Sequence, residues 1–362
     1  MRRRPFCYTG GLFPQVSRAG EWFLRSGIQA PDGGVARYYR VDQARNQAVS
    51  TEITGYAAST FVFLHSLTRD ARYLDRARAA ARFLTRAWDA ASGAMPFEVS
   101  SAQFTYFFDC GIVVRGLLAA WRATGGEEFL ESARAVGNSM AHDFRAPGGE
   151  FHPILALPAK RPLERDPLRW SQSPGCYQLK AGMAWWDLWE ATGDGSWRDL
   201  YHGLLEESLR TAPAFLPGHA GRRKVVDRLH AFLYFLEGLL PMAADARCAA
   251  ALRDGMERVA GLLRDLAPEF ERSDVYAQLL RVRLYADWAG AVELDRAAAQ
   301  GESERLVEFA ATAEDAHIDG GFYFGRTAAK WEPYINPVSA AFALQALALR
   351  SGAAQPHRHL LI

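Results

Sequence analysis

Residues 107–143 read FFDCGIVVRGLLAAWRATGGEEFLESARAVGNSMAHD, and the fold follows from this stretch. Its first half is apolar on nearly every face, whereas its second half repeats apolar residues at three- and four-residue spacing. Thr124-Gly125-Gly126 separates the halves. Because a helix that is apolar all round is buried and an amphipathic helix keeps one face in solvent, the stretch predicts a hairpin of one buried and one surface helix.

The same hairpin recurs along the chain at a period of about 45–60 residues, which is the mark of a repeat architecture. Turns such as Thr68-Arg69-Asp70 and Thr192-Gly193-Asp194 separate equivalent helices. The apolar helices are predicted at 51–67, 107–123, 175–191, 226–240, 273–289 and 336–350. The amphipathic helices are predicted at 15–28, 70–88, 127–143, 195–211, 245–265 and 301–316. Six buried helices ringed by six amphipathic ones predict an all-α (α/α)6 barrel or toroid of six helical hairpins.

Glycine-containing turns followed by aromatic residues lie between the hairpins. They are Asp32-Gly33-Gly34, Ser92-Gly93, Pro147-Gly148-Gly149 and Asp319-Gly320-Gly321. Glycine permits turns with positive φ, so the aromatic residues that follow are expected to form short β-like crossings over one mouth of the ring. No linker divides the chain, which predicts one toroid domain over 1–362, with an N-terminal arm at 1–14 and a frayed C-terminal tail at 352–362.

Composition narrows the classes of function. The formal net charge of +1 gives no general attraction to nucleic acid, and no stretch approaches the roughly 20 apolar residues of a membrane span. The four cysteines are scattered and the nine histidines show no metal-ligand spacing, so neither a disulfide framework nor a metal site is expected. Nucleotide-binding motifs and the GxSxG motif are absent, and no cofactor is expected. A cytoplasmic enzyme without nucleic-acid or membrane partners is therefore predicted, its oligomeric state open.

Polar residues gather in the first turns of the six apolar helices. If these helices all begin at one end of the ring, their first turns converge on a single cavity. Carboxylates, amides and aromatic rings together suit a sugar, and two carboxylates across a scissile bond supply the acid and the base of glycoside hydrolysis. The expected catalytic residues are Glu52, Asp109 and Asp227. The expected substrate-binding residues are Tyr56, Trp170, Gln178, Arg228, His230, Asp274, Gln278, Tyr334 and Asn336.

A structural explanation competes with this interpretation. Thr51, Asp109, Asp227 and Ser273 stand where helix N-caps are expected, and acidic residues are favoured at helix N-termini in any case. Caps do not require His230 and Gln278 one turn deeper in an apolar helix, where a buried polar group needs a partner or a ligand. Arginines in the long crossing at about 150–175 are weaker candidates for contact with an anionic sugar.

The chain resembles the six-hairpin glycosidase superfamily over about residues 15–351. The resemblance is carried by the hairpin number, the Thr-Gly-Asp-type turns and the Glu52-Ile-Thr-Gly-Tyr56 segment at the head of the second helix. It implies an (α/α)6 toroid and an activity among hydrolysis of glycosides, sugar epimerisation and polysaccharide lysis. A likeness to the unsaturated uronyl hydrolases would make Asp109 the proton donor. The tryptophan-rich segment of those hydrolases and the paired histidine motifs of the epimerases are not found.

Three functions follow from these patterns. The first is a glycoside hydrolase acting on an oligosaccharide, which could contain uronic acid, with Glu52 and Asp109 or Asp227 as acid and base. The second is a sugar epimerase or lyase in which His230, with Tyr56 or Tyr276, removes a proton beside a carbonyl or carboxylate. The third is a non-catalytic toroid that binds a glycan or a protein.

Overall fold

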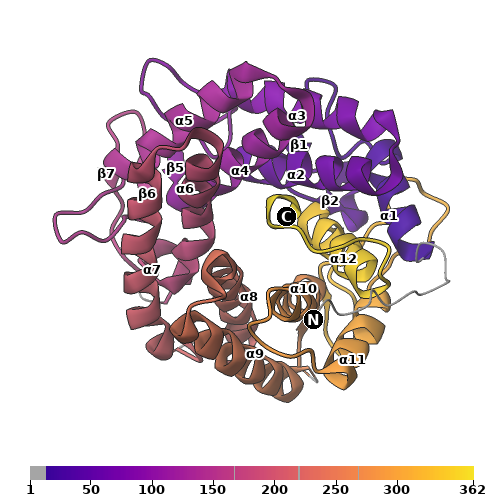
Figure 1. The fold of residues 1–362 in the computed structure, drawn as a ribbon. Helices are drawn as coiled ribbons and strands as arrows, with labels where there is room; N and C mark the ends of the chain where they lie inside the picture. The colour runs from indigo at the N-terminus through magenta and orange to yellow at the C-terminus, as the bar shows by residue number, and fades with distance from the viewer. Residues whose placement is uncertain (1–13, 167, 219–220, 268) are drawn as a thin grey trace.

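The computed structural model describes residues 14–166, 168–218, 221–267 and 269–362. Twelve α-helices in these residues form two concentric rings around a common axis (Figure 1). The inner ring consists of α2 (Thr51–Thr68), α4 (Phe107–Thr124), α6 (Leu179–Thr192), α8 (Arg222–Leu239), α10 (Ser273–Trp288) and α12 (Pro337–Arg350). The outer ring consists of α1 (Pro14–Arg25), α3 (Ala71–Ala87), α5 (Glu127–His142), α7 (Gly195–Phe215), α9 (Ala246–Leu266) and α11 (Arg296–Val307).

The inner ring is closed. Each inner helix packs against the next one, and α12 returns to pack against α2. Small residues allow close approach: a Cβ on Gly116 of α4 would lie 2.5 Å from the carbonyl oxygen of Gly55 in α2. The outer helices pack on the inner ones, with α1 covering α12. The predicted (α/α)6 toroid is therefore confirmed.

Side-chain caps and left-handed turns explain the hairpins. Aspartates cap four outer helices, with Asp70, Asp194, Asp245 and Asp295 accepting hydrogen bonds from backbone amides of α3, α7, α9 and α11. The inner helices α4 and α6 end at glycines with positive φ, 70° at Gly125 and 74° at Gly193. The chain can thus reverse within two or three residues and begin an outer helix.

Short strands lie at one end of the ring, as expected from the glycine turns. They are β1 (Val35–Ala36), β2 (Tyr39–Arg40), β3 (Arg45–Asn46), β4 (Val49–Ser50), β5 (Phe104–Tyr106), β6 (Ile154–Ala156), β7 (Arg161–Pro162), β8 (Glu271–Arg272), β9 (Gly325–Arg326) and β10 (Tyr334–Ile335). All their pairings are antiparallel, in the orders β1-β4, β10-β2-β3, β5-β6-β7 and β8-β9. Strands β4, β5 and β8 lead directly into α2, α4 and α10, and β10 ends one residue before Asn336, the N-cap of α12. The strands therefore mark the end of the ring where inner helices begin.

The glycine turns have the predicted backbone conformation. Gly33 has a φ of 99°, and its Cβ would lie 2.2 Å from the carbonyl oxygen of Ala79. Gly320 has a φ of 88°, and its Cβ would lie 2.4 Å from the carbonyl oxygen of Arg18. Both turns pack directly on the backbone of an outer helix, so only glycine fits there.

Two predicted segments differ from the structure. The last outer helix was expected at 301–316 but spans Arg296–Val307, because Asp295 caps it early and Phe309 and Ala311 turn away to bond the backbone of Tyr323 and Gly321. The segment expected to be a frayed tail instead folds back toward the middle of the ring, where Leu361 and Ile362 are buried (Figure 1). The predicted arm at 1–14 lies outside the described residues except for Pro14, which begins α1.

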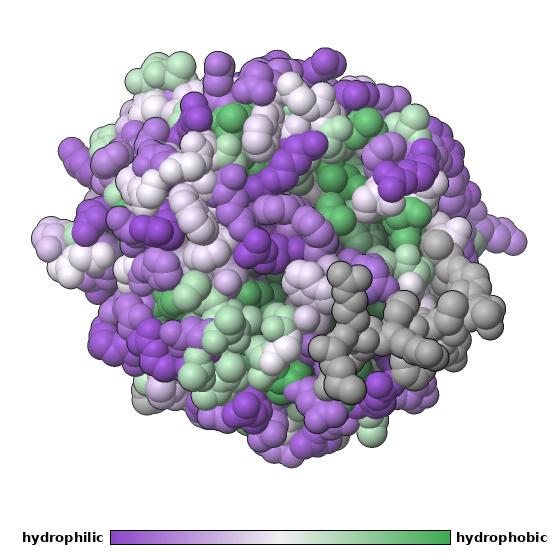
Figure 2. All heavy atoms as spheres, in the orientation of Figure 1, coloured by the Kyte–Doolittle hydropathy of each residue, from purple (hydrophilic) through white to green (hydrophobic). Residues whose placement is uncertain are grey.

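The surface agrees with the two-ring arrangement. In the view of Figure 2 the rim is mostly hydrophilic, and strongly hydrophobic residues show mainly in recesses between the helices. Cys110, Cys176 and Cys248 are buried, and none of the three forms a disulfide bond. Within the described parts of the chain, no helix combines the length and hydrophobicity needed to cross a membrane.

Candidate functional site

A cavity of about 450 Å³ opens at the end of the ring where the inner helices begin. Its volume falls in the range typical of small-molecule sites. Residues from α2, α4 and α8 and from the crossings line it: Glu52, Phe97, Tyr106, Phe108, Asp109, Pro153, Trp170, Ser171, Tyr177, Asp227, His230, Tyr234 and Arg272. The three predicted catalytic carboxylates thus share one cavity with two predicted binding residues, Trp170 and His230.

Two carboxyl groups form an interacting pair on one wall. Glu52 lies in the first turn of α2 and Asp109 in the first turn of α4. Burial raises the pKa of Glu52 to about 7, only partly offset by the charge of Arg37. Burial and the nearby charge of Glu52 hold the pKa of Asp109 well above its usual range. The pair therefore retains a proton near neutral pH and can donate it.

Asp109 has an unsatisfied atom. Its Oδ2 is buried and has no hydrogen-bond partner among the described residues. Burying a carboxyl oxygen in this way is costly unless a ligand or water completes its hydrogen bonding. Asp109 also lines the cavity, so its carboxyl group stands beside the space that a ligand would occupy.

His230 lies on α8 and is held through one ring nitrogen. Its Nδ1 is 2.6 Å from Oε1 of Gln278 and 3.4 Å from Oδ2 of Asp274. Both neighbours are acceptors, so Nδ1 carries the proton and Nε2 keeps a free lone pair. Burial lowers the pKa of His230 to about 4, despite the opposing effect of Asp274. The imidazole is therefore neutral at physiological pH and can act as a base.

Arg272 connects the two carboxylates of the opposite wall. Its guanidinium donates to both Asp274 oxygens, at 3.0 and 2.5 Å, and to Oδ1 of Asp227 at 2.5 Å. The Arg272 charge keeps the pKa of Asp274 below its usual value even though burial acts in the opposite direction. The Asp227 side chain is 49% exposed and faces the cavity, whereas that of Asp274 is 5% exposed. Asp227 is therefore the more accessible carboxylate of this wall.

Aromatic side chains supply the rest of the lining. Trp170 meets Tyr177 edge to face at 4.9 Å between ring centroids, and Tyr234 packs on Phe108 at 4.5 Å. Tyr234 also contacts the ring of His230 at 4.5 Å. A cavity with aromatic walls and a few charged groups at fixed positions is the usual form of a polar small-molecule site.

Several predicted binding residues do not line this cavity. Gln178 donates to the carbonyl of Phe151 and accepts from the amide of Gly175, and Arg228 donates to the carbonyl of Phe215. Asn336 caps α12. The ring of Tyr334 stacks on Phe324. These contacts give all four residues structural partners: backbone groups for Gln178, Arg228 and Asn336, and an aromatic ring for Tyr334.

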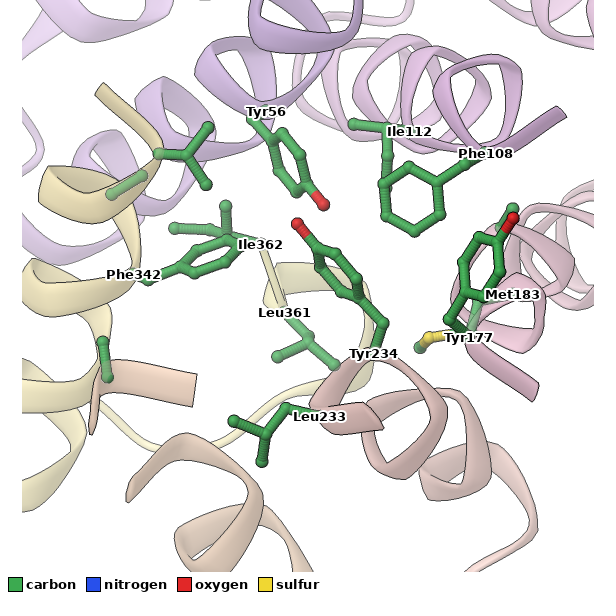
Figure 3. Close-up of a cluster of buried hydrophobic side chains, with 14 of the residues drawn as sticks. Tyr56, Phe108, Ile112, Tyr177, Met183, Leu233, Tyr234, Phe342, Leu361 and Ile362 are labelled. Atoms are coloured by element: carbon green, nitrogen blue, oxygen red, sulfur yellow. The ribbon is translucent and has the colours of Figure 1, made fainter. Parts of the chain in front are cut away.

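Three other predicted residues support the site from behind. Gln278 and Asp274 hold His230, as described above. Tyr56 lies deeper in the ring, and its hydroxyl points toward that of Tyr234 (Figure 3). Two arginines of the long crossing are engaged elsewhere: Arg165 pairs with Glu150 and Arg169 with Asp166. Their predicted contact with an anionic sugar receives no support from this geometry.

The proposed caps are not caps. The N-caps of α2, α4, α8 and α10 are Ser50, Tyr106, Gly221 and Arg272. Asp109 is the third residue of α4, and Asp227 is the sixth residue of α8. Thr51 and Ser273 donate instead to backbone carbonyls of neighbouring crossings. Capping therefore does not account for Asp109 or Asp227, although Asp109 stands in the first turn of α4, where an acidic residue is favoured by the helix dipole.

Sequence reasoning missed Arg37, Arg272 and Tyr234. Arg272 could have been found because it stands immediately before the buried helix that starts at Ser273. Tyr234 is four residues after His230 and so shares its helix face. Arg37 lies between β1 and β2, bonded to Glu98 at 2.8 Å, and no sequence pattern places it near Glu52.

Comparison with known proteins identifies the fold. No family model matches the chain, and no curated protein matches it. Among solved structures, the cellobiose 2-epimerase from Spirochaeta thermophila is similar with a TM-score of 0.71 and 16% identity, over 92% of this chain and 94% of that one. A D-mannose isomerase is similar with a TM-score of 0.68 and 10% identity, over 96% of this chain and 99% of that one. An unsaturated glucuronyl hydrolase mutant from Streptococcus agalactiae is similar with a TM-score of 0.61 and 13% identity, over 93% of this chain and 89% of that one. The six-hairpin (α/α)6 fold is thus confirmed, with the specific family unresolved.

Proposed function

We propose that the protein is a carbohydrate-active enzyme, most directly a glycoside hydrolase that acts on an oligosaccharide. The observation that carries the proposal is the Glu52–Asp109 pair, a half-buried and a buried carboxyl group that interact in a cavity with aromatic walls. A retained proton at this place can be transferred to a leaving group, which favours catalysis over a toroid that only binds a glycan or a protein. Solved structures with the same fold include proteins named as epimerase, isomerase and glucuronyl hydrolase, which supports a sugar as the substrate.

The cavity provides the groups for acid–base hydrolysis. The protonated carboxyl of the Glu52–Asp109 pair donates its proton to the glycosidic oxygen while the bond from that oxygen to the anomeric carbon breaks. A water molecule attacks the anomeric carbon and gives its proton to Asp227, the accessible carboxylate of the opposite wall. Arg272 orients Asp227, and Trp170 and Tyr177 provide apolar surface for the sugar ring.

Epimerisation is the second candidate, and His230 is the observation that favours it. Its neutral imidazole has a free Nε2, held in place by the bonds at Nδ1. Such a base can remove a proton from a carbon beside a carbonyl group, and the Glu52–Asp109 pair can protonate the carbonyl oxygen. No water is consumed in that reaction, so its products differ from those of hydrolysis.

A matched pair of variants separates the two reactions. For hydrolysis, Asp227→Asn should lower kcat by about 10²–10⁴-fold, the usual contribution of a general base, and His230→Gln should have a smaller effect. For epimerisation, His230→Gln should cause the larger loss of kcat and Asp227→Asn the smaller one. The measurement is the initial rate on a panel of oligosaccharides, with products identified by NMR. Equal and small losses in both variants would contradict both assignments.

The pH profile should show which protonation state is active. The proton donor must be protonated, and the pKa of Glu52 is about 7, so kcat should fall as the pH rises above about 7. If His230 is the base, kcat should also fall below about pH 4, where the imidazole becomes charged. A rate that rises steadily from pH 6 to 9 on any accepted substrate would contradict the role of the pair as proton donor.

A further inference from the structure

The end of the chain occupies the interior of the ring. After α12 the chain turns back, and the backbone of residues 357–362 enters among the inner helices (Figure 1). Leu361 is 3% exposed and Ile362 is 1% exposed. Figure 3 shows both among buried side chains of the inner ring, in one cluster with Phe342 and Tyr56. Burial this complete distinguishes the segment from an ordinary terminal tail.

Polar side chains from four inner helices bind the backbone of this segment. Arg115 of α4 donates to the carbonyl of Leu361 at 2.9 Å. Lys180 of α6 and Arg281 of α10 donate to the carbonyl of Ile362, at 2.9 and 3.1 Å. Gln345 of α12 accepts from the amide of Ile362 at 3.2 Å and donates to the carbonyl of Leu360 at 2.5 Å. These buried side chains would lose hydrogen-bond partners if the segment left.

The segment also lies next to the residues that support the cavity. Tyr56 belongs to the same buried cluster as Ile362 and directs its hydroxyl toward that of Tyr234 (Figure 3). Tyr234 lines the cavity and packs on both His230 and Phe108, each at 4.5 Å between ring centroids. A continuous set of packed side chains therefore joins the end of the chain to the candidate base.

We propose that residues 357–362 form a built-in floor of the active-site cavity, which excludes water from below and positions Tyr56 and Tyr234 under His230. The inner-ring groups Arg115, Lys180, Arg281 and Gln345 form the binding site for this segment. The proposal holds whichever reaction the cavity catalyses. It makes Leu361 and Ile362 positioning residues that act through the two tyrosines.

The test compares Leu361→Ser/Ile362→Ser with the wild-type chain. Water reaching the ring interior should reduce amide-exchange protection in the first half of α2 and of α8 by tenfold or more. The pKa of His230, lowered by burial to about 4, should rise by about one unit or more toward its ordinary value of 6.5, as read from the ring nitrogen shifts. The groups facing the imidazole are Asp274, Gln278, Arg272, Asp227 and Tyr234, and none is altered by these substitutions.

Two further variants keep the test decisive. Arg358→Ala is the matched control, because the Arg358 side chain is 44% exposed and pairs with Glu190 rather than with the groups around Ile362; it should leave exchange and the His230 titration unchanged. A chain lacking residues 357–362 should recover protection and the low His230 pKa when a synthetic peptide of these six residues is added. If the serine variant folds with an unchanged exchange pattern and His230 titration, the floor role is wrong. If the shortened chain keeps both properties without the peptide, that outcome also overturns it.

Discussion

Asp109→Asn should lower kcat on an accepted glycan by about 10²–10⁴-fold, the range expected for loss of a general acid. Glu52→Gln should produce a loss of the same order, because the charge of Glu52 raises the pKa of Asp109 and burial raises the pKa of Glu52 itself. An amide can donate a hydrogen bond but cannot deliver a proton to the leaving oxygen. The measurement is the initial rate under saturating substrate, with KM determined separately.

These losses should occur without unfolding. At neutral pH and above, burial disfavours the charged form of either carboxyl, so neutral amides should leave the free energy of unfolding unchanged or increase it. Glu190→Gln is the matched control. Burial also raises the pKa of Glu190, but it lies near the C-terminal end of α6 and does not line the cavity. Full kcat in Glu52→Gln would remove Glu52 from the reaction.

Glu237→Gln should destabilise the fold more than any other single carboxylate-to-amide change considered. Glu237 is fully buried in α8 between Lys180, at 2.8 Å, and Arg281. Removing one partner of a buried ion pair typically costs about 3–5 kcal/mol, because the remaining charge is left uncompensated. The free energy of unfolding from denaturant titration, compared at one pH, measures this loss.

The destabilisation should depend on pH in a defined direction. Burial lowers the pKa of Lys180 to about 7, with Glu237 opposing that shift. Because the pKa in the folded protein lies below the ordinary 10.5, the unfolded chain binds more protons between pH 7 and 10.5, and stability rises with pH there. Without Glu237 the pKa of Lys180 falls further, so the loss should be larger at pH 6 than at pH 8. Glu206→Gln is the control: Glu206 pairs with Arg247, but both side chains are more than half exposed, so this change should alter the free energy of unfolding little at either pH.

The architecture was predictable because its signals are local. An apolar helix such as 107–123 and an amphipathic one such as 127–143 differ in composition over four or five turns, and Gly125 marks the boundary between them. Ring closure then follows from the need to bury six apolar helices together. The last outer helix was misplaced because its end depends on backbone pairing of Phe309 with Tyr323, which no local pattern reveals.

The site was only partly predictable. First-turn residues of inner helices, such as Glu52 and Asp109, could be found because the helices all begin at the same end. Arg228 and Asn336 are also polar residues near the starts of inner helices, so the sequence does not distinguish them from Glu52 and Asp109. Their side chains, however, form hydrogen bonds with backbone groups. The burial of Leu361 and Ile362 could not be foreseen, because their partners Arg115, Lys180 and Arg281 are spread over three helices distant in sequence.

Product analysis in ¹⁸O-labelled water tests the central claim most directly. The wild-type protein and the Glu52→Gln/Asp109→Asn double variant are incubated with a panel of neutral and uronic-acid-containing oligosaccharides, and products are examined by mass spectrometry and NMR. Hydrolysis predicts shortened chains with one ¹⁸O atom per bond cleaved, formed by the wild type and not by the variant. Unlabelled epimerised or unsaturated products, or equal turnover by both proteins, would contradict a hydrolase that uses this carboxyl pair.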